Sequence, residues 1–231
     1  KKIAKDMGYF PNAAARVLKT NESNNIGVLY FDEAAMGLTH EYFAGVLNGI
    51  KAQAEMLGYD ITFINTCFEN RKMSYYEHCR YRNFEGVVIV CANFDDPDVI
   101  ELMNSEIPVV TIDYVHHNCT AVTSNNIQGM EDLVKYIYSQ GHRKIAYIHG
   151  QEGSSVTRDR LASFYRTIDE LGLEIPDTYV RSADYLETKG SAKQTKELLN
   201  LEDPPTCIIY PDDTSLIGGR NVIIEMGLRI P

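Results

Sequence analysis

Short apolar runs alternate with longer amphipathic stretches from Asn25 onward. Residues 26–31 form an unbroken apolar run of the kind found in buried strands. Residues 39–57 follow with Tyr, Phe, Val, Leu and Ile at helical spacing, and Gly58 stands where a helix would end. Alternation of strand and helix at this period predicts an α/β fold with doubly wound parallel sheets.

The same alternation continues through the rest of the chain. The further predicted strands are residues 59–65, 86–91, 107–112, 145–149, 178–181 and 206–210, and the further predicted helices are residues 70–82, 95–104, 191–201 and 215–226. Two groups of strands indicate two Rossmann-like lobes, with the crossover between them near Gly150.

Residues 141–172 combine a strand, a polar loop and a helix. Gly150 and Gly153 let the backbone turn, and Gly172 closes the helix. Open α/β sheets bind ligands beyond the carboxyl ends of their strands, so this loop predicts a site for a small polar ligand. The alternative is that its arginines are solvated or paired with an acid such as Asp159. The polar side chains between strand and helix are Ser154, Ser155, Thr157, Arg158 and Arg160.

Short acids and amides follow several other predicted strands. They are suited to binding hydroxyl groups, and losing one such hydrogen bond costs about 1–3 kcal/mol when its partner is buried. An alternative interpretation, equally favoured for each of these side chains, is that it caps its own loop and binds no ligand. These candidates are Asp32, Asn93, Asp113, Asp212 and Asp213.

Composition narrows the class of protein. The chain has 231 residues, 44% of them hydrophobic, and no apolar run approaches the roughly 20 residues of a membrane helix. No secretory signal opens it, and five cysteines without a CxxC pair favour a reducing compartment, so we expect a cytoplasmic protein. His116, His117 and Cys119 lack a second ligand pair at zinc spacing, so a polar loop is favoured there and no metal or cofactor is predicted.

Charge is distributed unevenly. The net charge of −10 argues against a large nucleic-acid surface, yet residues 1–22 carry +3. Residues 1–7 and 12–18 are helical in pattern but have little core-forming surface, so the second segment forms a helix only when a partner packs against it, or else it is a frayed tail.

Three stretches resemble LacI/GalR-type bacterial transcription regulators. GHRKIAYIHG followed by TRDRLASF is similar to the effector-domain signature, which implies that Arg160 grips a small-molecule effector. GYFPNAAARVLKT is similar to the hinge helix of that family. The resemblance implies that Leu18 inserts into the minor groove of operator DNA, with Ala15 and Lys19 beside it. It also implies that the protein binds the operator as a homodimer.

The whole chain from Asn25 resembles the periplasmic-binding-protein type I architecture, in which the ligand lies between two lobes. This implies a headpiece end and hinge at residues 1–20, an N-terminal lobe at 21–149 and an incomplete C-terminal lobe at 150–231. PDDTSLIGG resembles a helix-start element that favours Asp213, with Asp212 before it. The family also implies effector contacts at Tyr42, Phe43, Tyr185 and Ser124, although Ser124-Asn125 departs from the usual Asp-Asn.

These features predict a ligand-responsive repressor. The effector expected from the resemblance is a sugar such as a galactoside, and purines or other metabolites remain open. The alternative is a free-standing periplasmic-type sugar-binding protein, which has the same fold. Enzyme motifs such as GxGxxG, GxSxG and HExxH are absent from the sequence, so no catalytic residues are predicted.

Overall fold

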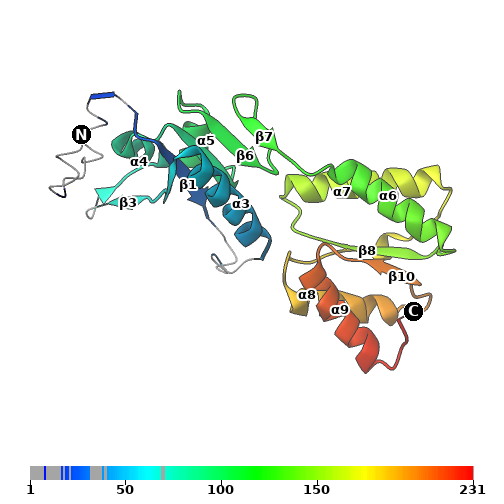
Figure 1. Cartoon of the computed structure of the whole chain (residues 1–231). Coiled ribbons are helices and arrows are strands. Elements are labelled where there is room, and N and C mark those ends of the chain that lie inside the picture. The colour runs from blue at the N-terminus through cyan, green and yellow to red at the C-terminus, as the bar shows by residue number, and fades with distance from the viewer. Residues whose placement is uncertain are drawn as a thin grey trace. The chain divides into compact units, whose positions relative to one another are not determined.

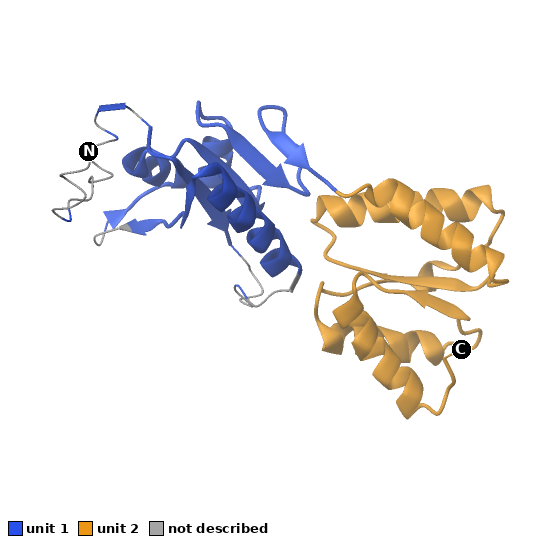
Figure 2. Ribbon diagram, in the orientation of Figure 1, with its two compact units in different colours: residues 1–123 blue, residues 124–231 orange. Residues whose placement is uncertain are grey.

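The computed structural model describes residues 22–31, 41–68 and 71–230, together with Gly8, Val17, Lys19, Thr20 and Leu38. The chain divides into two compact units, Lys1–Thr123 (unit 1) and Ser124–Pro231 (unit 2), which are coloured separately in Figure 2. In the described part of the chain, no helix is long and apolar enough to cross a membrane.

Unit 1 contains a five-stranded sheet in the order β2-β1-β5-β6-β7, with every strand parallel to its neighbours. A separate antiparallel hairpin pairs β3 with β4. The elements of unit 1 are β1 (Asn25–Tyr30), α3 (Glu41–Leu57), β2 (Asp60–Phe63), β3 (Cys67–Phe68), β4 (Arg71–Lys72), α4 (Tyr75–Arg82), β5 (Gly86–Cys91), α5 (Pro97–Met103), β6 (Val109–Ile112) and β7 (Thr120–Val122).

The core of unit 1 forms where β1 and β5 meet α4 and α5. Leu29, Ile89 and Leu102 are almost completely buried there. Helix α4 begins at a capping box, in which the Ser74 hydroxyl accepts from the Glu77 amide and the Glu77 carboxylate accepts from the Ser74 amide. These local contacts fix where α4 starts and therefore which of its faces is buried.

Unit 2 contains a three-stranded parallel sheet in the order β10-β8-β9. Figure 1 shows α6 and α7 on one face of this sheet and α8 and α9 on the other. The elements of unit 2 are α6 (Asn126–Ser139), β8 (Ile145–His149), α7 (Ser155–Glu170), the 3-10 helix η2 (Asp177–Tyr179), β9 (Val180–Ser182), α8 (Thr188–Leu199), β10 (Cys207–Ile209) and α9 (Asp213–Glu225).

Strand β8 is the centre of unit 2 and is buried along its whole length. Tyr147 packs with Phe164 of α7 on one face of the sheet, whereas Ile148 packs with Leu198 of α8 on the other. Burial on both faces explains why β8 appears in the sequence as a continuous apolar run.

The predicted α/β class with parallel sheets is confirmed, but three details differ. The division between the units falls after Thr123, not near Gly150, because β8 pairs with β9 and β10 inside unit 2. The helix predicted at residues 70–82 begins only at Tyr75, since the chain first forms the β3–β4 hairpin. Neither β7 nor α6 was predicted.

The hinge region is described only in part. Val17, Lys19 and Thr20 are helical, and the side chain of Lys19 is exposed. Ala15, Leu18 and the helix predicted at residues 1–7 lie outside the described residues.

Candidate functional site

The Arg160 side chain joins three elements of unit 2. It projects from α7, and its Nε donates to Asn126 Oδ1 at 2.9 Å while Nη1 donates to the Pro211 carbonyl at 3.1 Å. Among the described residues, no acceptor contacts Nη2 and no acid forms an ion pair with Arg160. The half-buried guanidinium is therefore held in one orientation with part of its donor set unused.

Tyr185 lies against the turn that follows β8. Its hydroxyl hydrogen-bonds to the buried Thr157 hydroxyl of α7 at 2.7 Å. A Cβ atom at Gly150 would lie only 2.1 Å from the Tyr185 ring, whereas one at Gly153 would meet nothing within 4 Å. Gly150 is thus required for the close approach of an aromatic ring, a role that differs from the turn function predicted for it.

Asp212 and Asp213 have different environments although they are adjacent. Asp212 is the N-cap of α9, where its carboxylate accepts from the amide and hydroxyl of Ser215 at 2.9 and 3.0 Å and from the Leu186 amide at 2.8 Å. Asp213 is exposed, and no side-chain hydrogen bond joins it to any other described residue. Asp212 therefore stabilises the loop, and Asp213 presents its carboxylate outward.

Ser124 and Asn125 lead into α6 but do not contact Arg160. The Ser124 carbonyl accepts from the Asn126 side chain at 3.2 Å, and Asn125 caps the helix by accepting from the Gln128 amide. Asn126, which is 9% exposed, is the residue that holds Arg160. Sequence reasoning missed it, because its position two residues after Ser124 gave no sign of a partner 34 residues away.

In unit 1 the structure brings together two predicted residues from opposite parts of the sequence. Tyr42, at the start of α3, donates its hydroxyl to Asp113 Oδ2 at 2.7 Å. Asp113 follows β6 and has a positive φ of 54°. Phe43 packs edge-on against Tyr42 and against Tyr30, with ring centroids 5.1 and 5.4 Å apart. An aromatic and acidic cluster therefore lies at the carboxyl edge of this sheet.

The loops after β5 and β6 add a second aromatic feature. Asn93 caps its own loop, because its Oδ1 accepts from the Asp95 amide at 3.0 Å. Beside it, Phe94 and Tyr114 stack face to face, with centroids 3.8 Å apart and planes 2° from parallel. This pair was not predicted, since the two residues are distant in sequence. Asp32 lies outside the described residues.

Other candidates for chemistry lie in the core or are inert. Burial raises the pKa of the Cys79 thiol to about 12 and lowers the pKa of His78, so neither a thiolate nor an imidazolium is favoured there. Burial also raises the pKa of Tyr147, whose hydroxyl has no hydrogen-bond partner among the described residues. The described chain holds no cluster of three metal-ligating side chains, although His116 Nδ1 and Cys119 Sγ lie 3.8 Å apart.

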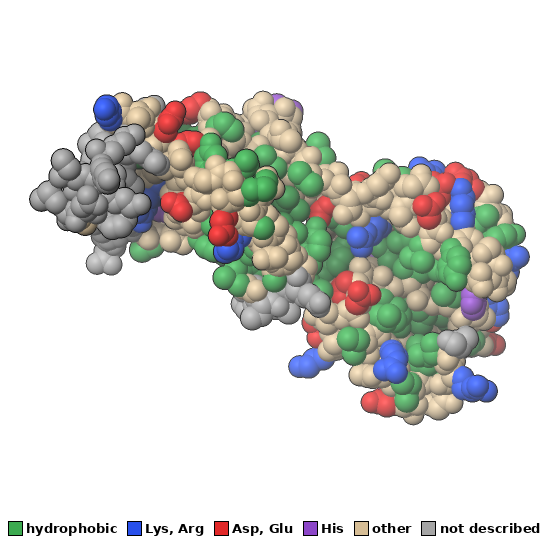
Figure 3. All heavy atoms as spheres, viewed as in Figure 1, with side chains coloured by type: hydrophobic (Ala, Val, Ile, Leu, Met, Phe, Trp, Pro, Cys, Tyr) green, Lys and Arg blue, Asp and Glu red, His purple; other side chains and the backbone are tan. Residues whose placement is uncertain are grey.

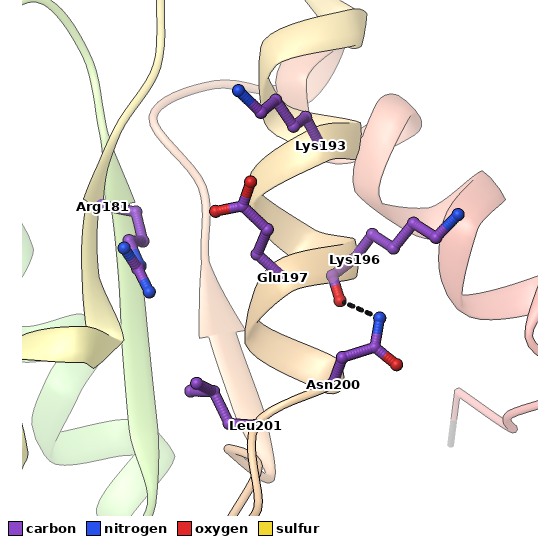
Figure 4. A pocket seen from close by; sticks show the side chains of 6 residues that line it. All are labelled: Arg181, Lys193, Lys196, Glu197, Asn200 and Leu201. Carbon is purple, nitrogen blue, oxygen red and sulfur yellow. Dashed lines mark hydrogen bonds between the residues drawn. The ribbon is translucent and has the colours of Figure 1, made fainter.

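A surface hollow of about 500 Å³ in unit 2 lies apart from these residues, between β9 and α8. Figure 4 shows Glu197 and Lys193 extending toward the side on which Arg181 lies, while Lys196 points the other way. The Arg181 Nε is buried without a hydrogen-bond partner in the described structure. None of the predicted effector residues lines this hollow.

Comparison with known proteins identifies the family. Residues 23–231 match the model for periplasmic binding proteins and the sugar binding domain of the LacI family. The chain belongs to this family. It is the effector-binding domain of a LacI-family transcriptional regulator, not an enzyme.

Individual relatives agree with this assignment. The chain is 25% identical over 230 residues to the HTH-type transcriptional repressor PurR of Aliivibrio salmonicida, covering 98% of this chain and 67% of that protein. It is also 25% identical over 232 residues to the probable HTH-type transcriptional repressor ExuR of Bacillus subtilis, covering 99% and 68%. The chain thus spans about two thirds of these relatives.

A solved structure supports the fold. A regulatory protein of the LacI family from Chloroflexus aggregans superposes with a TM-score of 0.74 at 24% identity, covering 90% of this chain and 75% of that one.

Proposed function

We propose that the chain binds a small polar effector through Arg160 and Asp213 and thereby controls binding to operator DNA. The observation that carries this proposal is the Arg160 guanidinium, which is fixed by Asn126 and the Pro211 carbonyl while no described residue accepts from Nη2. Asp213 stands two residues after Pro211, the carbonyl of which accepts from Arg160, and its exposed carboxylate offers acceptors. Donors and acceptors carried by such connected elements suit a ligand with several hydroxyl groups.

A sugar such as a galactoside is the effector that we favour. The description of the matching family includes a sugar binding domain, and the Tyr185 ring offers a flat apolar face beside the polar groups. Tyr42, Phe43, Asn93 and Asp113 of unit 1 and Ser124 of unit 2 are further proposed contacts. A purine is the second candidate, because the Phe94 and Tyr114 rings of unit 1 are aromatic groups of the kind on which a base stacks.

A regulator is a better proposal than a free-standing periplasmic-type sugar-binding protein. The two classes share the fold and the family description. The named relatives are HTH-type repressors and match almost all of this chain, including the segment before residue 23. We therefore propose a cytoplasmic homodimer whose hinge helices place Ala15, Leu18 and Lys19 on the operator. The effector changes operator binding only if it binds the DNA-bound and the DNA-free conformations of the protein with different affinities.

The effector is tested by a thermal-shift screen of the full-length protein against monosaccharides, β-galactosides, phosphosugars and purines. A ligand at about 100 times its Kd raises apparent stability by about 2.7 kcal/mol. We expect a sugar to raise the Tm of the wild type but not that of Arg160→Ala. The matched control is Arg158→Ala, which removes an exposed arginine from the same helix and should retain the shift.

Two outcomes would contradict the proposal. A purine that alone raises the Tm would reject the sugar assignment, and a ligand whose effect survives Arg160→Ala would reject the site. The proposed operator binding is tested separately by Leu18→Ala. This change should weaken operator binding without changing the thermal shift produced by the effector.

A further inference from the structure

Helix α4 and strand β4 form a positively charged surface in an acidic protein. Residues 71–82 carry four Lys and Arg against one Glu, a net charge of +3 in a chain of −10. We name the surface formed by Arg71, Lys72 and Arg80 the α4 basic face. These three side chains line a hollow of about 530 Å³ together with Tyr76, Glu77 and Tyr81.

Two of these cations have no structural role that explains them. Arg80 pairs with Glu106, and Arg80 and Arg82 both lie in the last turn of α4, where positive charge stabilises a helix end. Arg71 and Lys72 are exposed on β4, and no ion pair joins either of them to another described residue. The Glu77 carboxylate nearby is engaged in the capping box of α4. Arg71 and Lys72 are therefore available to an external anion.

The C-terminal end of α4 lies near the edge of unit 1 where the chain arrives from the hinge. The Glu85 carboxylate, three residues after Arg82, accepts from the Asn24 amide at 2.7 Å, and the Glu85 amide donates to the Asn25 carbonyl at 3.0 Å. The loop between α4 and β5 is thus hydrogen-bonded to the start of β1. Lys19, five residues before Asn24, belongs to the helical segment proposed to bind DNA.

We infer that the α4 basic face contacts the phosphate backbone of DNA beside the operator while the hinge is bound. This inference rests on the proposed DNA-binding function and assigns part of it to the effector domain. Cations at the hinge-proximal edge meet the duplex without any base contact, so they add affinity and not sequence specificity. On the face of unit 2 shown in Figure 3, by contrast, acidic and basic side chains are interspersed.

The test measures binding of the full-length protein to fluorescently labelled 30-bp duplexes by anisotropy between about 50 and 200 mM salt. The variant is Arg71→Gln with Lys72→Gln. Each lost phosphate contact reduces the slope of log K against log salt by about 0.9, so we expect a decrease of about two for each protomer on the duplex, or about four for the proposed homodimer, and an affinity loss of at least about tenfold at low salt. The loss should be equal for operator and scrambled DNA.

The matched control is Lys193→Gln with Lys196→Gln, which removes the same charge from exposed positions on α8 of unit 2. We expect this control to retain the wild-type salt slope. Equal slopes in the wild type and the β4 variant, or equal losses in both variants, would overturn the inference. Unchanged Tm values in both variants establish that neither result comes from misfolding.

Failure of the proposed function gives a different result. If the wild type does not distinguish operator from scrambled DNA, the regulator proposal fails while the salt slopes still report the backbone contact. If the wild type binds the operator specifically and the β4 variant has the same salt slope, only the inference about the α4 basic face fails.

Discussion

The two units hold their polar side chains in different ways at the carboxyl ends of their strands. In unit 2, Arg160 is fixed by two hydrogen bonds, and Tyr185 is held by a buried threonine and by contact with Gly150. In unit 1, the main polar contact is the exposed hydrogen bond between Tyr42 and Asp113. Unit 2 presents a preorganised set of groups, and unit 1 presents one that solvent can reach.

This difference affects the effector contacts that are proposed for each unit. A group already held in its binding geometry loses less conformational entropy when a ligand arrives. A proposed contact of unit 2 should therefore contribute more affinity than the exposed Tyr42 or Asp113 of unit 1.

The largest loss of stability should come from Gly150→Ala. The new Cβ would overlap the Tyr185 ring, and relieving such overpacking costs about 1–3 kcal/mol. We expect urea unfolding to show a loss of about 2 kcal/mol and effector binding to weaken. Gly153→Ala is the matched control, because its Cβ meets nothing within 4 Å, and its effect should stay within about 0.5 kcal/mol. Equal effects of the two changes would show that unit 2 is not preorganised as described.

A smaller loss of stability should distinguish the variant at Asp212 from the variant at Asp213. Asp212→Ala removes the N-cap of α9 and should lower the free energy of unfolding by about 1 kcal/mol. Asp213→Ala should leave stability nearly unchanged but weaken effector binding, measured by isothermal titration calorimetry. If Asp213→Ala destabilised the protein as much as Asp212→Ala does, the assignment of capping to one and ligand contact to the other would be wrong.

The smallest effect should come from Tyr42→Phe. It removes an exposed 2.7 Å hydrogen bond and should lower the free energy of unfolding by about 0.5 kcal/mol or less. Thr157→Val removes a bond of the same length from a buried position and leaves the Tyr185 hydroxyl without its partner, so about 1 kcal/mol should be lost. Chemical denaturation of both variants measures the difference. A larger loss for Tyr42→Phe would reverse the comparison between the units.

The sequence predicted most of the strands but missed β7 and the β3–β4 hairpin. Strands β5 and β8 have the predicted bounds, because a strand buried on both faces is an apolar run whose ends are visible locally. Helix α6 was missed although Met130, Val134 and Ile137 are buried at helical spacing. The signal was present there but was not used.

What the sequence determined by itself was the fold class and most of the elements, since each depends on a local pattern, whereas the role of Arg160 in effector binding stays a prediction. The tertiary structure decided which residue holds Arg160, which aspartate caps α9 and why Gly150 must lack a side chain. The partners of Arg160 lie 34 and 51 residues away along the chain. Such partners are set by how α6, α7 and the loop after β10 pack on the sheet, and no local pattern of hydrophobic and polar residues records that packing.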